Sequence, residues 1–263
     1  PTIWIPYGLD RCRTSLIKQN DVYYMWYYKE NSYSTGSIIH ARGASHKDFA
    51  EYSMAVPSSV NEKAIDNSSL VTGPDVVFAD DNQYLYFINQ NDANSYIMRC
   101  ESDDLDNWTN IVSATGISVD VSSCSIVYKD SEYHMWCTSS NTIYYYRSQD
   151  GLAFSIQNSG SPIVDFAYDV SCPSVLWDGS KYLMAYTSFE SGMSIILAES
   201  TDGIAWTGQQ EIIASSFNPC IIQDYYNGYL ETRIMYNQTV DDQVQIKTAI
   251  ISNESWQDFE TSV

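Results

Sequence analysis

Hydrophobic and polar residues alternate in a unit that runs from Asp169 to Trp206 and sets the pattern for the whole chain. The unit contains an apolar segment after a proline (PSVLW), a turn on Asp178-Gly179, an aromatic-rich segment (YLMAYTS), a third segment (SIILAES) and a tight turn that ends in tryptophan. Alternation over short segments bounded by turn residues predicts β-strands. No window combines sustained helical periodicity with caps, so almost no helix is expected.

This unit recurs about every fifty residues. Aligned on the tyrosine that opens the second strand, the copies fall at Tyr23, Tyr84, Tyr133, Tyr182 and Tyr229, at intervals of 61, 49, 49 and 47 residues. A period of about fifty residues suits a four-stranded propeller blade. The sequence therefore predicts an all-β fold, a five-bladed β-propeller with about four antiparallel strands per blade.

The five blades are expected to form one domain that covers residues 1–263. Their expected limits are roughly 11–56, 73–112, 120–163, 169–213 and 218–263. The segment 2–5 is expected to pair into the last blade and close the ring, because closure removes exposed sheet edges. A polar linker between blades one and two accounts for the longer first interval.

A second motif closes the blades. It reads STDGIAW at 200–206, SQDGLAF at 148–154 and SDDLDNW at 102–108. Serine and aspartate side chains can bond the backbone of such a turn, glycine permits a positive φ, and the aromatic residue fills the gap between blades. We interpret the motif as structural and expect Trp108 and Trp206 to be largely buried between blades.

Charge and cysteine usage narrow the function classes. The formal net charge is −20, from 33 acidic and 13 basic residues, which disfavours nucleic acid, anionic membranes and strongly anionic glycans as partners. No apolar run is long enough to span a membrane, and no signal peptide is recognised. The six cysteines lack CxxC or CxxH spacing, so no zinc site is expected. We interpret them mainly as small buried thiols, with a disulfide left open.

The blade pattern resembles a known group. GPDVVFADDNQYLYF in blade two, SIVYKDSEYHMWCTS in blade three, and PSVLWDGSKYLMAYTS with STDGIAW in blade four are similar to blades of the five-bladed propeller superfamily of arabinanases, levansucrases and invertases. The resemblance implies a glycoside-hydrolase scaffold in which two carboxylates flank the scissile bond at the narrow end of a central funnel.

The family commonly places an Asp directly before the first-strand proline, or a Glu two positions before it. The residues directly before the proline or its equivalent are Arg13, Gly73, Ser123, Cys172 and Asn218, and those two before it are Cys12, Thr72, Ser122, Ser171 and Phe217. None is acidic. The resemblance therefore implies the scaffold without its usual catalytic carboxylates, and we expect little or no hydrolysis.

Another set of carboxylates recurs. Asp10, Asp120 and Asp169 each precede their anchor tyrosine by thirteen residues, and Asp75 directly follows a proline. If the blades superpose, these side chains approach one end of the channel. Three interpretations stay open: a displaced catalytic set with one raised pKa, a cation site suited to Ca²⁺, or caps of the loops that enter each blade. No other cofactor or metal is expected.

Two function classes follow for this scaffold. The first is a non-catalytic propeller that recognises a glycan or a partner protein, as on a bacteriophage tail, another virion surface or an extracellular surface. The alternative is a diverged glycoside hydrolase that acts on neutral oligo- or polysaccharides through Asp10, Asp120 and Asp169. Aromatic and polar side chains near the predicted rim are the candidate ligand-binding residues: Tyr7, Arg13, Tyr168 and Tyr225.

Overall fold

The computed structural model describes most of the chain. The described ranges are 14–32, 35–45, 48–56, 70–90, 95–117, 119–163, 168–190, 192–226, 229–240 and 243–251. Within them, β-strands dominate, and the one helical element is a single 3₁₀ turn at Asn158–Gly160. No helix in these ranges has the length and apolar character needed to cross a membrane.

The strands form five antiparallel sheets, each built from consecutive segments of the chain. Blade one contains β1 (Thr14–Gln19), β2 (Val22–Ser32), β3 (Thr35–Ser45) and β4 (Asp48–Val56). Blade two contains β5 (Leu70–Ala79), β6 (Asn82–Gln90), β7 (Ser95–Ser102) and β8 (Thr109–Ser113). Blade three contains β9 (Ser123–Lys129), β10 (Glu132–Ser139), β11 (Thr142–Ser148) and β12 (Ser155–Ile156). Blade four contains β13 (Val170–Trp177), β14 (Tyr182–Ser188), β15 (Ser194–Ser200) and β16 (Thr207–Ala214), and blade five contains β17 (Ser216–Tyr226), β18 (Tyr229–Val240) and β19 (Gln243–Ile251).

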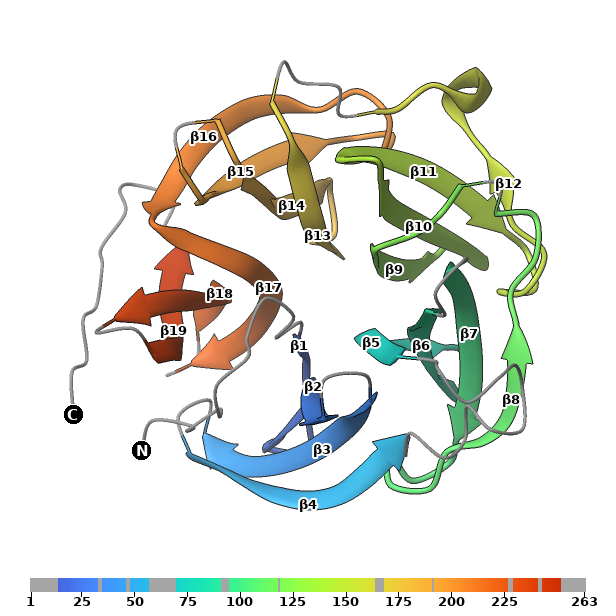
Figure 1. Ribbon diagram of the computed structural model, residues 1–263, viewed down its shortest axis with the longest axis vertical. Coiled ribbons are helices and arrows are strands. Elements are labelled where there is room, and N and C mark those ends of the chain that lie inside the picture. Colours follow the sequence, from blue (N-terminus) through green and yellow to red (C-terminus); the bar gives the residue numbers. More distant parts are fainter. Residues whose placement is uncertain are drawn as a thin grey trace.

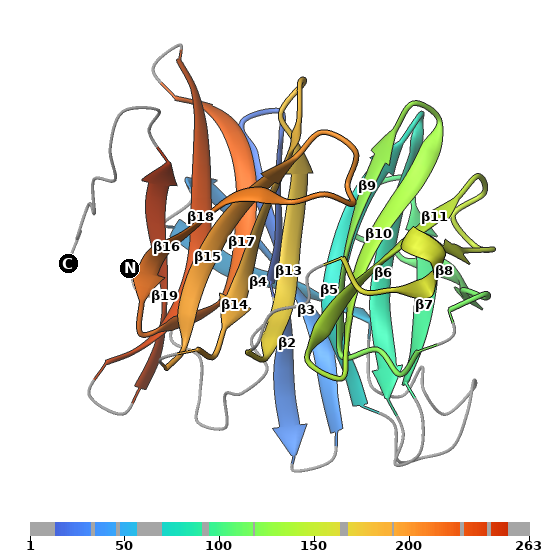
Figure 2. The same cartoon turned by 90° about the horizontal axis from the view of Figure 1, so that it is seen from above.

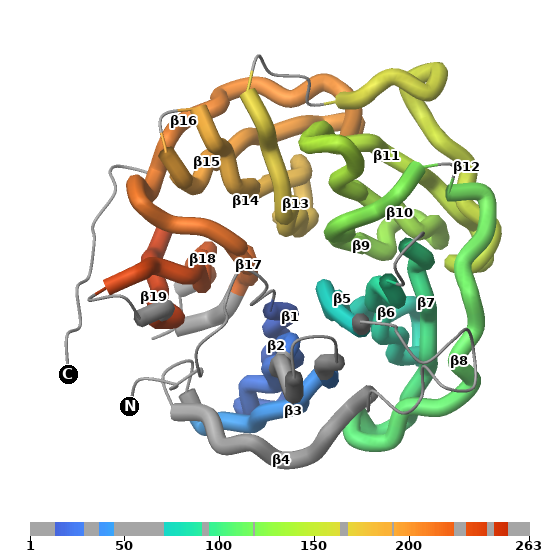
Figure 3. The backbone as a smooth tube through the Cα atoms, in the orientation of Figure 1, coloured from blue at the N-terminus to red at the C-terminus, as the bar shows by residue number. Residues whose placement is uncertain are grey.

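The five sheets are arranged around a central axis (Figure 1). The first strand of each blade is innermost, and the tube drawing follows each blade outward from it (Figure 3). Figure 2 shows the strands running between the two faces of the ring. The inner strands contact one another in the order β1, β5, β9, β13, β17 and back to β1, so the ring is closed. The predicted five-bladed propeller is therefore confirmed.

The hydrophobic core lies between blades. Five clusters of buried side chains are present, and each combines residues of two neighbouring blades. Trp136 of blade three, for example, packs edge-on against Trp206 of blade four, with ring centroids 6.1 Å apart. Burial of both sheet faces explains why second strands such as β2 and β10 are rich in aromatic residues on both sides.

The closing turns follow one hydrogen-bonding scheme. In blade four, Ser200 Oγ accepts the Gly203 N–H at 2.9 Å, and Asp202 Oδ1 accepts the N–H groups of Ile204 and Ala205 at 2.8 Å each. The turn of blade three repeats these contacts. Gly203 has a φ of 77°, and its carbonyl accepts the indole N–H of Trp206 at 3.1 Å. The motif is therefore structural, as predicted.

The two tryptophans of this motif differ in burial. Trp206 is buried as expected, but Trp108 is only partly buried. In blade two, Leu105 stands where the other turns have glycine, adopts a φ of 64° and is itself 1% exposed. Leu105 therefore occupies much of the space between blades one and two, and Trp108 packs at the edge of that cluster.

Several expected features lie outside the described residues or stay untested. The described part of blade five has three strands, and the segment 2–5 that would close the ring falls outside it. The strands of the first four blades span 14–56, 70–113, 123–156 and 170–214, and the expected blade limits stay predictions. The assignment of the whole chain to one domain stays a prediction.

Candidate functional site at the channel mouth

Three inner strands bend at equivalent positions beside the axis. Pairing with the second strand shifts register between Thr72 and Asp75 in blade two, and at the matching points of blades four and five. The residue before the proline has a positive φ each time: 60° at Gly73, 53° at Cys172 and 52° at Asn218. Such a β-bulge leaves residues unpaired and re-aims their side chains. Here it turns them toward the channel.

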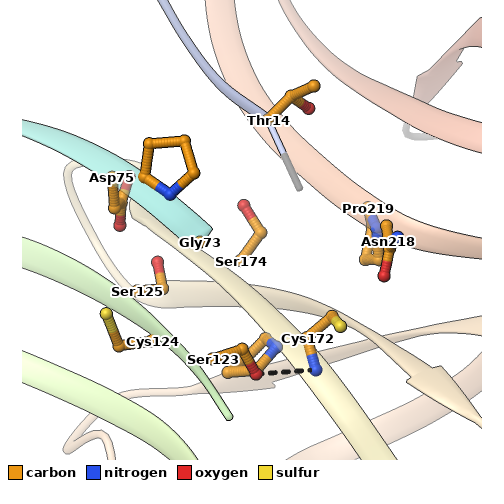
Figure 4. A pocket seen from close by; sticks show the side chains of 12 residues that line it. Thr14, Gly73, Asp75, Ser123, Cys124, Ser125, Cys172, Ser174, Asn218 and Pro219 are labelled. Carbon is orange, nitrogen blue, oxygen red and sulfur yellow. Dashed lines mark hydrogen bonds between the residues drawn. The ribbon is translucent and has the colours of Figure 1, made fainter. Parts of the chain in front are cut away.

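The bulges surround a small cavity on the axis (Figure 4). Its volume open to water molecules is about 30 Å³. The lining side chains come from all five inner strands: Thr14, Gly73, Pro74, Asp75, Ser123, Cys124, Ser125, Cys172, Pro173, Ser174, Asn218 and Pro219. A volume of this size accommodates one or two water molecules. The cavity is therefore a narrow polar neck rather than a pocket for a sugar ring.

A ring of hydrogen bonds between blades passes through this neck. At one equivalent position in each inner strand, the side chain accepts a backbone N–H from the next blade. The pairs are Ser15 with Val76 (3.0 Å), Asp75 with Ile126 (2.7 Å), Ser125 with Val175 (3.0 Å), Ser174 with Ile221 (3.0 Å) and Cys220 with Leu16. The ring joins neighbouring blades where their sheets are closest to the axis.

Asp75 is the exception in this ring, because the other four positions carry a hydroxyl or a thiol. Its Oδ2 accepts the Ile126 N–H, and its Oδ1 accepts the Ser15 hydroxyl at 3.1 Å. Burial raises the pKa of Asp75 to about 6, against the opposing effect of the hydrogen bond from Ile126. A buried carboxyl group with such a pKa retains its proton in mildly acidic solution, as a general acid must.

The described positions directly before the first-strand proline or its equivalent, where the resemblance implies an acid, lie around this same cavity. Gly73, Ser123, Cys172 and Asn218 all line it, and none has a carboxyl group. The Nδ2 atom of Asn218 is buried and lacks a hydrogen-bond partner. The equivalent residue of blade one, Arg13, lies outside the described residues. Among the lining residues that the structure describes, Asp75 provides the one carboxyl group.

Of the other candidate carboxylates, the two that the structure describes, Asp120 and Asp169, do not line the cavity. Asp120 is exposed, and its Oδ1 accepts the N–H of Ser95 at the start of β7 at 2.9 Å, so it joins the entry loop of blade three to blade two. Asp169 is exposed, and its backbone carbonyl accepts the N–H of Phe189 at 3.0 Å. Asp10 lies outside the described residues. In the described part of the chain, no three His, Cys, Asp or Glu residues are grouped so that they could hold a metal ion.

Apolar side chains of blade four are exposed at the same end of the channel. Tyr168 and Phe189 are each 45% exposed, and Met193 is 42% exposed. Val170, which pairs with Ser188, is two residues from the bulge at Cys172, and Tyr168 is four residues from it, or about 13 Å along an extended chain. We call Tyr168, Phe189 and Met193 the blade-four platform.

Acidic groups border the platform. The side chain of Tyr168 is hydrogen-bonded to Glu190, and that bond raises the pKa of the Tyr168 hydroxyl. The N–H of Ser216 donates to the Met193 carbonyl at 3.1 Å, which ties the platform to blade five. The platform thus combines aromatic faces with carboxylate acceptors.

Sequence reasoning found only part of this site. Tyr168 is in the platform as a candidate ligand-binding residue, whereas Tyr7 and Arg13 lie outside the described residues and the side chain of Tyr225 is not described. The sequence analysis did not identify the other two platform residues, Phe189 and Met193. The signal was available, because SFESGMS places two large apolar residues at a turn between strands, where exposure is expected.

Comparisons place the fold among known propellers. The chain matches a thermostable family-43 glycoside hydrolase with a TM-score of 0.72 at 13% identity, over 97% of this chain and 95% of that one. It matches an N-acetylgalactosamine deacetylase from F. plautii, in complex with blood group B trisaccharide, with a TM-score of 0.72 at 13% identity, over 95% and 93% of the two chains. An exo-β-1,3-galactanase from Clostridium thermocellum gives 0.73 at 11% identity, over 94% and 60%. No family model and no curated protein sequence matches this chain.

Proposed function

We propose that this protein is a recognition propeller that binds a neutral glycan at the channel mouth and does not hydrolyse it. The observation that carries the proposal is an exposed aromatic platform beside a neck whose described wall has a single carboxyl group. Hydrolysis by the usual mechanism needs two carboxyl groups, one on each side of the scissile bond. Binding needs neither.

The shape of the neck favours docking above it. Space for one or two water molecules excludes a sugar ring. A glycan would therefore lie across the mouth, with a ring face against Tyr168 or Phe189. The negative face of an aromatic ring attracts the C–H groups of a sugar, and the carboxylates of Glu190 and Asp169 can accept its hydroxyl groups.

Charge and fold analogy support a neutral glycan as the ligand class. A net charge of −20 opposes binding of anionic chains. Several proteins that share this fold are named for glycan chemistry, among them the galactanase and the deacetylase bound to a blood group trisaccharide. These proteins resemble this chain in fold only. The evidence for glycan binding that comes from this chain itself is the blade-four platform.

A panel of immobilised neutral oligosaccharides tests the proposal. We expect retention of the protein, weakened about tenfold by Phe189→Ala or Tyr168→Ala, since one aromatic contact contributes about 1.4 kcal/mol. Phe78→Ala is the matched control, because Phe78 is also an exposed aromatic residue but lies near the far end of β5, by the hairpin. Equal loss in all three variants, or retention of none of the sugars, would contradict the proposal.

The alternative function is a diverged glycoside hydrolase, and Asp75 is the residue of the described site that favours it. Its pKa of about 6 suits a general acid, and it lies on the axis. A hydrolase that used it would lose activity as the pH rises through about 6 and would be inactive as Asp75→Asn. A pH profile of product release on the same panel separates this alternative from recognition alone.

A finer proposal concerns location. We assign the protein to a virion surface, such as a bacteriophage tail, on the basis of its acidic composition and its scaffold for glycan recognition. Virion proteins would then be partners as well. Immunogold labelling of purified particles tests this, and labelling confined to particle-free fractions would reject it.

A further inference from the structure

Two buried cysteines face each other across one hairpin of blade three. Cys124 on β9 and Cys137 on β10 are directly paired residues of the antiparallel sheet. They are 7% and 0% exposed and belong to the cluster between blades two and three. Neither is part of a disulfide in this structure.

The turn of this hairpin determines which kind of pair they form. Asp130 and Ser131 have φ values of 53° and 58°, as in a two-residue type I′ turn, so the flanking pair Lys129 and Glu132 is hydrogen-bonded. Hydrogen-bonded and non-hydrogen-bonded pairs then alternate along the strands. Cys124 and Cys137 lie five pairs beyond Lys129 and Glu132, so they form a non-hydrogen-bonded pair.

A backbone contact agrees with this register. The carbonyl of Thr138, next to Cys137, points at β9 and accepts the N–H of Ser122 at 2.9 Å. Residues of a non-hydrogen-bonded pair have Cα atoms about 4.5 Å apart and side chains on the same face. That separation lies within the Cα range of about 4.4–6.8 Å that disulfides span. The nearby Cys124 also contributes, after burial, to the raised pKa of the Cys137 thiol.

One of the two cysteines borders the axial cavity. Cys124 is among the residues that line the axial cavity and is labelled in Figure 4, whereas Cys137 is not among them and is fully buried. A small oxidant that enters the neck therefore meets Cys124 first. The neck admits a molecule the size of water or hydrogen peroxide, and excludes a bulky thiol reagent.

We propose that Cys124 and Cys137 form an oxidisable pair that a peroxide entering the channel converts to a disulfide within blade three. The deprotonated sulfur of Cys124 attacks one peroxide oxygen, the O–O bond breaks, and a sulfenic acid and one water result. The sulfur of Cys137 then displaces a second water and the S–S bond forms. The two thiols lose two electrons and two protons, and the peroxide is reduced to two waters.

Mapping of the oxidised wild-type protein tests the pair directly. The native chain is treated with hydrogen peroxide, its remaining thiols are alkylated during unfolding, and peptides are identified without reduction. Trypsin cleavage at Arg99 and Lys129 leaves Cys100 and Cys124 in one peptide, so a protease that cleaves before aspartate, as at Asp120, must separate them. We expect a peptide that links Cys124 to Cys137 and is released by dithiothreitol.

Stability provides a second measurement on the same sample. A bond that closes this short hairpin is expected to raise Tm by about 5–10 °C, reversibly with dithiothreitol. Cys137→Ser should abolish both the link and the shift, whereas Cys172→Ser, which removes another thiol of the cavity, should change neither. A link from Cys124 to Cys172, accumulation of unlinked sulfinic acid at Cys124, or two thiols that stay alkylatable would each overturn the proposal.

Discussion

Replacement of Asp75 by asparagine should change how stability depends on pH. Asparagine has nearly the same shape, and its amide can still accept the Ile126 N–H and donate to Ser15. The substitution removes the ionisable carboxyl group. In the wild type, burial raises the pKa of Asp75 from 3.8 to about 6, so the folded protein holds a proton that the unfolded chain releases earlier.

The sign and size follow from linkage. Below about pH 3.8, Asp75 is protonated in both states and does not affect the pH dependence of stability. Between that pH and about 6, the folded state binds more protons, so the free energy of unfolding falls as the pH rises. At 1.36 kcal/mol per unit, the shift from 3.8 to about 6 corresponds to about 3 kcal/mol. Part of the residue faces the cavity, so water there makes this an upper bound.

Urea denaturation at several pH values measures the effect. The difference in unfolding free energy between Asp75→Asn and wild type should become more positive from pH 4 to pH 7 by up to about 3 kcal/mol. Asp75→Ser, which installs the residue found at the same ring position in blades one, three and four, should flatten the same part of the profile. Parallel profiles for wild type and both variants would refute the reasoning.

Two further predictions concern the closing turns of blades three and four. Trp206→Ala should cost about 3–5 kcal/mol of stability, because it removes a buried ring that packs on Trp136. An unchanged thermal melt would contradict this. Gly151→Ala should destabilise by about 1–3 kcal/mol, since φ is 68° and a Cβ would lie 2.5 Å from the Tyr86 hydroxyl oxygen. Gly179→Ala, at φ 99° with open space around it, is the control and should cost less in the same denaturation assay.

The repeat could be predicted from the sequence because one residue type marks the same place in every blade. Tyr23, Tyr84, Tyr133, Tyr182 and Tyr229 all lie within the first three residues of a second strand. Their spacing gave the number of blades and their order. Leu105 broke the pattern at one turn, and there Trp108 is buried less completely than Trp206.

The site was harder to predict, because it depends on contacts between blades. Asp75 looked like one of several recurring carboxylates, and only the contact between β5 and β9 shows that it bonds Ile126 in a ring otherwise made by serine and cysteine. Asp120 follows the same spacing rule as Asp169 but is engaged with Ser95 of another blade. Spacing along the chain cannot distinguish these environments.

The measurement that tests the central claim most directly follows one retained oligosaccharide over time. Wild-type protein at high concentration is incubated with the neutral oligosaccharide that it binds best, at pH 5 and pH 7, and the sugar is analysed by mass spectrometry. Recognition without hydrolysis predicts that the oligosaccharide stays intact while binding is lost in Phe189→Ala. Shorter sugars that appear with the wild type and not with Asp75→Asn would contradict the account and establish a hydrolase.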